Sequence, residues 1–325
     1  MTEAILEPDL PICDAHHHLW DREDVGAYLA AEMGADAAAG HRVESTVYVE
    51  ARTFWRPDGP EALRPLGETE FALGQAAMAA GGRYGPVRIA EAIVGHADLT
   101  LGGRVEAVLD AHLRIAGARF KGVRHSGAFV DDPSIRASHT APPAGLYAMP
   151  AFREGMAVLG RMGLTFDAWQ FHPQLAEVAA LADALPDLPI VLNHVGGVLG
   201  IGSYKDRRQE VFEAWRADIR DLARRQNVWV KLGGLGMTIG GFRLHRRDTR
   251  PSSEELAALW RPYIETCVEA FGPTRGMFES NFPVDRGSCD YVELWNAFKR
   301  ITAGASAGEK ALLYRDTARR FYRMG

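Results

Sequence analysis

The sequence predicts a (β/α)8 barrel of the TIM-barrel class, built as a single domain with long loops after its strands. Short apolar runs rich in Val, Ile, Leu and Phe occur eight times, and each is followed by a stretch with helical periodicity. Such alternation predicts parallel strands covered by helices, and eight repeats favour closure into a barrel. A doubly wound open sheet is the structural alternative, because counting repeats does not prove closure.

Each strand is predicted from an apolar run bounded by turn residues, and each helix from apolar residues spaced three and four apart. In chain order, the strands are expected at 12–18, 44–51, 88–97, 119–125, 164–170, 189–195, 228–233 and 276–282. The helices are expected at 68–81, 104–116, 149–162, 173–185, 206–226, 253–271, 291–302 and 308–323. The barrel core is therefore expected to span residues 12–325, with residues 1–11 as an N-terminal extension.

Loop lengths give an independent argument for a barrel enzyme. The links from a helix to the next strand are short turns such as Met162-Gly163 and Gln226-Asn227. The links that follow strands are long, as at 19–40, 52–67, 126–148 and 234–252. Barrel enzymes build their active sites from the loops at the C-terminal ends of the strands, so this asymmetry predicts a site at that face.

Composition excludes several classes of function. A chain of 325 residues that is 47% hydrophobic can bury a large core, and its formal charge of −5 is spread over mixed signs. This balance argues against a nucleic-acid partner. The three cysteines are far apart, which argues against disulfides and a thiolate zinc site, and no apolar run reaches membrane-spanning length. We expect a cytoplasmic protein that binds a small anionic molecule, and its oligomeric state stays open.

The run from Ile12 to His18 is a strand that ends in histidines. Side chains alternate along a strand, so Asp14, His16 and His18 are expected on one face. Two imidazoles at a strand end form half of a metal site, which needs further ligands and an open position. The alternative is that these histidines bind substrate or hydrogen-bond one another.

Polar side chains follow most of the other strands, at the face where a barrel carries its active site. A single residue of this kind is usually a hydrogen-bonded core group, but so many titratable groups at one rim are costly to bury without a function. The additional candidates are Glu50, Arg124, His125, Asp167, Trp169, His194, Lys231, Glu279, Asn281 and Asp285.

The roles of these residues follow from their chemistry. His194 ends the sixth strand and is expected at the mouth as a ligand, base or acid, the alternative being a core histidine. Arg124 and His125 are expected to clamp a carboxylate, and Lys231 has a similar role. The alternative for Arg124 and His125 is an internal salt bridge with Glu50 or Asp167, and a similar alternative applies to Lys231. The glycine-rich segment 233–241 lacks a phosphate-binding pattern and is expected to form a mobile lid.

Taken together, several motifs resemble the amidohydrolase superfamily, and within it the amidohydrolase-2 branch of sugar-acid lactonases and pyrone-dicarboxylate lactonase. These motifs are Asp14 to Asp21 (DAHHHLWD), Lys121 to His125 (KGVRH), Thr165-Phe166-Asp167 with His172 to Leu175 (HPQL), Leu192 to Gly197 (LNHVGG), and Met277 to Asp285 (MFESNFPVD). The resemblance extends from about residue 12 to the end and implies a (β/α)8 barrel that hydrolyses a lactone or related ester.

By this resemblance, His16 and His18 correspond to a metal-ligand pair, which some lactonases of the branch use without a metal. His194 corresponds to the histidine of the sixth strand, and Arg124 to an arginine near the acidic or carbonyl end of the substrate. The implied cofactor is therefore one divalent ion, zinc or manganese, or none.

The eighth strand departs from the family pattern Ser-Asp-Trp-Pro, in which the aspartate is the general base. This chain has Ser-Asn-Phe-Pro, and the amide of Asn281 cannot accept a proton from water at neutral pH. Glu279, Asp285 or His194 is expected to replace it as the base, with Asn281 and Trp169 as substrate contacts.

The expected function is a hydrolase that opens a lactone or cyclic ester of a small carboxylic or sugar acid. Activated water would attack the carbonyl while Arg124, His125 and Lys231 hold anionic groups. The alternatives are a nonoxidative decarboxylase or hydratase, and a non-catalytic ligand-binding barrel suggested by Asn281.

Overall fold

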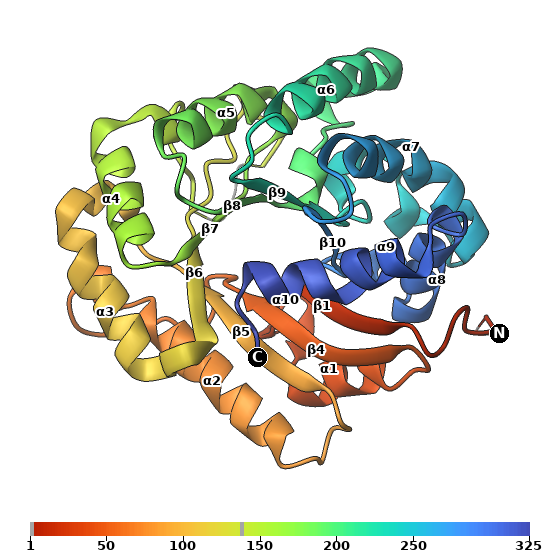
Figure 1. Ribbon diagram of the computed structural model, residues 1–325, viewed down its shortest axis with the longest axis horizontal. Coiled ribbons are helices and arrows are strands. Elements are labelled where there is room, and N and C mark those ends of the chain that lie inside the picture. Colours follow the sequence, from red (N-terminus) through yellow and green to blue (C-terminus); the bar gives the residue numbers. More distant parts are fainter. Residues whose placement is uncertain (1–2, 137–139) are drawn as a thin grey trace.

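The computed structural model describes residues 3–136 and 140–325 and contains one eight-stranded parallel sheet (Figure 1). The strand order β1-β4-β5-β6-β7-β8-β9-β10 follows the chain, so each strand lies beside the next one along the sequence. The strands are β1 (Pro11–His17), β4 (Arg42–Val49), β5 (Arg88–Gly95), β6 (Phe120–Arg124), β7 (Thr165–Ala168), β8 (Ile190–Leu192), β9 (Val228–Leu232) and β10 (Gly276–Phe278). This order confirms the predicted (β/α)8 topology.

Helices surround the sheet, as Figure 1 shows. They are α1 (Ala30–Ala37), α2 (Leu66–Ala80), α3 (Val105–Ala116), α4 (Pro150–Arg161), α5 (Leu175–Ala184), α6 (Arg208–Leu222), α7 (Ser253–Phe271), α8 (Tyr291–Ile301), α9 (Ala307–Ala311) and α10 (Thr317–Phe321). The bounds of α7 agree with the sequence prediction, because Ser252 caps its first turn by accepting a hydrogen bond from the backbone of Glu255.

The barrel closes between β1 and the residues that follow β10. His18 N donates to the Phe282 carbonyl at 2.7 Å, and Asn281 N donates to the His16 carbonyl at 2.9 Å. The carboxylate of Asp14 adds a side-chain link, since it accepts a hydrogen bond from Ser280 N at 2.8 Å. The first and last strands therefore meet at the C-terminal rim, where the sequence predicts the site.

Several elements differ from the sequence prediction. β8 ends at Leu192 instead of residue 195, because His194 and Val195 have positive φ angles of 54° and 47° that turn the chain away. β10 ends at Phe278 instead of residue 282. The helix expected at 308–323 is interrupted by a π-helical turn, Leu312–Asp316. The link 19–40 is not a plain loop, since it contains α1 and a hairpin of β2 (Trp20–Arg22) and β3 (Gly26–Tyr28).

The C-terminal segment packs against the inner face of the barrel strands. Phe321, Tyr322 and Met324 form one apolar cluster with strand residues that include Cys13 and Val47. In Figure 1, α9 and α10 run across the strands beside β1 and β10. The C-terminal residues thus pack beneath the polar groups that occupy the rim. Within residues 3–136 and 140–325, no helix combines the length and the apolar composition needed to cross a membrane.

Candidate active site

The two histidines of the first strand converge at the rim. His16 Nε2 and His18 Nε2 lie 3.2 Å apart, and both rings are buried. His18 Nδ1 lies 2.8 Å from the Val49 carbonyl oxygen, which can only accept, so Nδ1 carries the proton and Nε2 has a lone pair. Burial lowers the pKa of both histidines well below the usual range, and the nearby cations of Lys231 and Arg124 add to this effect. The two imidazoles are therefore neutral at physiological pH.

Asp14 does not join these histidines, which corrects the alternation expected for the strand. Its carboxylate accepts hydrogen bonds from Ser280 N and, at 3.0 Å, from the Tyr291 hydroxyl of α8. The register of β1 against β4 shifts between Asp14 and His17, so simple alternation fails at this point.

A buried ion pair supports His16 from below. Lys231 Nζ lies 2.6 Å from Asp167 Oδ2 and 3.2 Å from His16 Nδ1. Tyr322, which follows α10, donates its hydroxyl to the same Asp167 carboxylate at 3.0 Å. Asn193 Nδ2 is a third donor to this carboxylate, at 3.1 Å. These donors fix the position of the Asp167 carboxylate, which in turn holds the ammonium group of Lys231 against His16.

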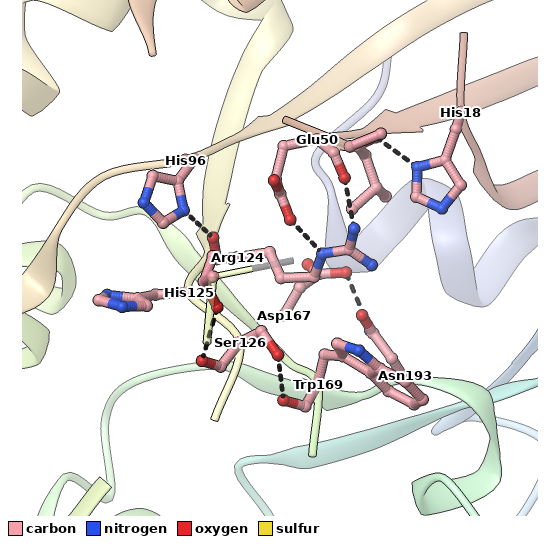
Figure 2. Close-up of polar contacts among 12 residues, drawn as sticks. His18, Glu50, His96, Arg124, His125, Ser126, Asp167, Trp169 and Asn193 are labelled. Carbon is pink, nitrogen blue, oxygen red and sulfur yellow. Dashed lines mark hydrogen bonds and ion pairs between the residues drawn. The ribbon is translucent and has the colours of Figure 1, made fainter. Parts of the chain in front are cut away.

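Arg124 approaches His16 from another side. Its Nε donates to Glu50 Oε1 at 2.7 Å, its Nη2 donates to the Glu50 carbonyl, and its Nη1 lies 3.4 Å from His16 Nε2. Figure 2 shows the guanidinium directed toward His18, with the Glu50 carboxylate beside it. The salt bridges that the sequence offered as alternatives for Arg124 and Lys231 are therefore both present. They also hold two cations against the histidines.

Glu279 and His194 form the second half of the site. Glu279 Oε1 accepts a hydrogen bond from the backbone N of His194 at 3.1 Å and lies 2.8 Å from its Nδ1. Burial raises the pKa of Glu279 to about 8, although the charge of Lys231 opposes this shift. Burial lowers the pKa of His194 well below its usual value. The ring of Trp169 lies edge-on to His194, with 4.9 Å between the centroids. The structure thus brings together His16, His18, Arg124, Trp169, His194, Lys231 and Glu279.

Asp285 and Asn281 form a separate pair beside this group. Asn281 Nδ2 donates to Asp285 Oδ1 at 2.8 Å, and Gly236 N donates to Asp285 Oδ2 at 2.8 Å. Burial raises the pKa of Asp285 to about 8. Of the carboxylates expected to replace the missing aspartate, Glu279 contacts the histidines, whereas Asp285 is bonded to the amide.

His125 lies on the other side of the strand from Arg124. Its Nδ1 accepts a hydrogen bond from Leu99 N at 3.2 Å, and its ring packs against His96 with 5.1 Å between the centroids. Figure 2 shows His96 and His125 away from the Arg124 guanidinium. Neighbouring residues of an extended chain face opposite ways. Arg124 and His125 therefore do not form a clamp side by side.

The glycine-rich segment after β9 packs tightly onto the site. A Cβ added at Gly234, where φ is +67°, would lie 2.5 Å from His194 Nδ1. At Gly236, it would lie 2.8 Å from Asp285 Cγ. These glycines allow the backbone to approach the catalytic candidates closely, a function that the sequence analysis did not assign to them.

The residues present fit a divalent cation. His16, His194 and Glu279 each offer a ligand atom, and these atoms lie within 4.8 Å of one another. Glu279 Oε2 lies 3.1 Å from His16 Nδ1, yet it makes no hydrogen bond to any residue that the structure describes. Neutral imidazoles and a carboxylate are the ligands that zinc prefers. His16 therefore belongs to both this group and the predicted pair with His18.

Tyr322 and Gly234 are two site residues that the sequence pattern does not single out. Tyr322 is four positions after Ala318 in the last helical segment, where nothing in the pattern distinguishes it from a packing residue. The role of Gly234 depends on how close two loops come, which glycine content alone does not reveal. The doublet His194-Val195 before two glycines was the available signal for a turn at the rim.

Two known proteins are similar to this chain over nearly its whole length. An uncharacterized protein, y4mH, from Sinorhizobium fredii is 33% identical over 337 residues, covering 97% of this chain and 99% of the relative. An L-fucono-1,5-lactonase from Burkholderia multivorans is 29% identical over 335 residues, covering 95% of each chain.

Among solved structures, an amidohydrolase from Burkholderia multivorans with bound zinc superposes with a TM-score of 0.75 at 25% identity, covering 97% of this chain and 99% of that one. A 5-carboxyvanillate decarboxylase from Sphingomonas paucimobilis shares the fold, with a TM-score of 0.59 at 13% identity over 97% of this chain and all of the other. A family model described as amidohydrolase matches residues 13–324. The chain therefore belongs to the amidohydrolase family.

Proposed function

We propose that this protein hydrolyses a lactone or cyclic ester of a small carboxylic or sugar acid. The proposal rests on the 2.8 Å contact between Glu279 Oε1 and His194 Nδ1, which supplies a carboxylate beside a candidate base although Asn281 cannot act as one. The 29% identity to a lactonase over nearly the whole chain favours this reaction.

In the proposed reaction, His194 takes the proton from water. Glu279 Oε1 accepts from the backbone of His194 and orients its ring, so that Nδ1 carries a proton and Nε2 is the free base. The oxygen of the water forms a bond to the acyl carbon, and the ring C–O bond then breaks. The proton passes from His194 to the departing alkoxide, which leaves a hydroxy acid.

The cations beside His16 stabilise the negative charge that develops on the carbonyl oxygen. Lys231 and Arg124 are held in place by Asp167 and Glu50, so they need little reorganisation during the reaction. If a divalent ion were held by His16, His194 and Glu279, with His18 beside them, His194 would be a ligand and not the base, and the ion would act as a Lewis acid and lower the pKa of bound water.

The test combines elemental analysis of the purified protein with a pH-stat assay on a panel of γ- and δ-lactones, with and without added zinc or manganese. Glu279→Gln is expected to lower kcat by about 10²- to 10⁴-fold. Glu106→Gln, on the exposed surface of α3, is the matched control and should leave kcat unchanged. The proposal fails if no lactone is opened under any metal condition, and carbon dioxide release from an aromatic acid would indicate a decarboxylase instead.

A further inference from the structure

A small enclosed pocket adjoins His194 at the rim of the barrel. It lies between the loop after β8, which contributes Val198, and the loop after β9, which contributes Leu235, Met237, Ile239 and Phe242. Its free space is about that of one water molecule. The pocket therefore suits a group no larger than a methyl.

The walls of this pocket are apolar. None of the residues that line it within the described chain carries a charge, and His194 is held neutral by burial. The hydroxyl of Tyr263 at its edge already accepts a hydrogen bond from Arg208 Nη1 at 3.4 Å. A hydroxyl group directed at the side chains of Val198, Leu235 and Met237 would lose its hydrogen bonds to water, whereas a methyl group in the same place would lose none.

The two loops are joined, so the pocket is preformed. Gly200 N donates to the Ile239 carbonyl at 2.8 Å, and a Cβ at Gly200 would lie within 3 Å of Gly240 and collide with its backbone. The Arg208 guanidinium lies over the Phe242 ring, 4.2 Å from its centroid. These contacts fix the apolar walls against His194 instead of leaving them as a loosely packed surface.

We propose that this pocket binds a methyl-sized apolar substituent on the ring of the substrate. This inference rests on the proposed function and narrows it to an alkyl-substituted lactone, as opposed to a fully hydroxylated sugar lactone. His194 would lie beneath the acyl carbon while the substituent enters the space between Val198 and Met237.

The first test compares kcat/KM for δ-valerolactone, its four monomethyl derivatives and glucono-1,5-lactone. At least one methyl derivative is expected to exceed the parent lactone by about tenfold or more, the discrimination that one carbon contributes in a hydrophobic pocket. Equal or faster hydrolysis of glucono-1,5-lactone than of every methyl derivative would overturn the inference.

A variant then ties this preference to the pocket. Met237→Gln places an amide of similar length in the half-buried wall and should reduce the preference for the methyl lactone to less than about threefold. Met78→Gln, at a position on α2 that is 52% exposed, is the matched control and should retain the wild-type preference. An unchanged preference in Met237→Gln would refute the assignment.

Calorimetry with the ring-opened acids separates this inference from the proposed reaction. Tighter binding of a methyl-substituted 5-hydroxypentanoate than of 5-hydroxypentanoate, lost in Met237→Gln, supports the pocket even if no lactone is turned over. Hydrolysis of all lactones at similar rates, with no difference in acid binding, overturns the pocket and leaves the hydrolase proposal intact.

Discussion

Replacing Gly234 by alanine tests whether the loop after β9 presses on the catalytic candidates. The residue has a φ of +67°, in the left-handed region that costs an alanine about 1–2 kcal/mol. The new methyl would also lie 2.5 Å from His194 Nδ1 and 2.6 Å from its Cγ, closer than van der Waals contact allows. Displacing a buried ring in this way typically costs a further 1–3 kcal/mol, roughly. The expected loss of unfolding free energy is therefore about 2–5 kcal/mol.

The matched control is Gly82→Ala. Gly82 has a similar φ of +76°, but a Cβ there would have no atom within 4 Å, so only the backbone cost applies. Equilibrium unfolding in urea, followed by circular dichroism, measures both variants against wild type. Gly234→Ala should be less stable than Gly82→Ala by about 1–3 kcal/mol, and lactone hydrolysis should fall only in Gly234→Ala. Equal losses of free energy in the two variants would refute the close packing of this loop on His194.

Three further outcomes are expected. Burial lowers the pKa of His112 to about 4, so below about pH 6.5 the imidazole binds a proton in the unfolded chain but not in the folded one, and the free energy of unfolding falls. In urea titrations at pH 7 and pH 5, wild type should lose about 2 kcal/mol more unfolding free energy than His112→Gln. Parallel pH profiles of the two proteins would contradict this. Tyr322→Phe removes a donor to the buried Asp167 carboxylate and should lower the unfolding free energy by about 2 kcal/mol in urea, whereas an unchanged midpoint would assign no energetic role to that hydroxyl. Zinc at about 100 times its Kd should raise the unfolding free energy by about 2.7 kcal/mol, and a response in Glu279→Gln as large as in wild type would exclude Glu279 as a ligand.

The arrangement of the strands could be predicted from the sequence because it depends on local periodicity. His16, Arg124, His194 and Lys231 each end an apolar run, and parallel strands of one barrel bring such positions to the same rim. The prediction that they meet needed only the topology and not the packing of individual side chains.

What could not be predicted depends on register and on contacts between distant segments. The shift in β1 directs Asp14 to Ser280 and Tyr291 instead of to the histidines. The position of Gly234 against His194 follows from how the loops after β8 and β9 pack, which no local pattern encodes. The same holds for Tyr322, whose hydroxyl reaches Asp167 only because the C-terminal segment folds back into the barrel.

The barrel closes between its first strand and the residues after its last, so the candidate site is complete only when the whole barrel has been synthesised. His16 comes from the first strand, Glu279 follows the last, and Tyr322 comes later still. A nascent chain that has displayed seven strands outside the ribosome therefore lacks the carboxylate that orients His194 and the phenol that steadies Asp167. Chains that stop short of the final helices would therefore have an incomplete rim: those that end before Glu279 lack the carboxylate beside His194, and those clipped before Tyr322 lack the hydroxyl that contacts Asp167.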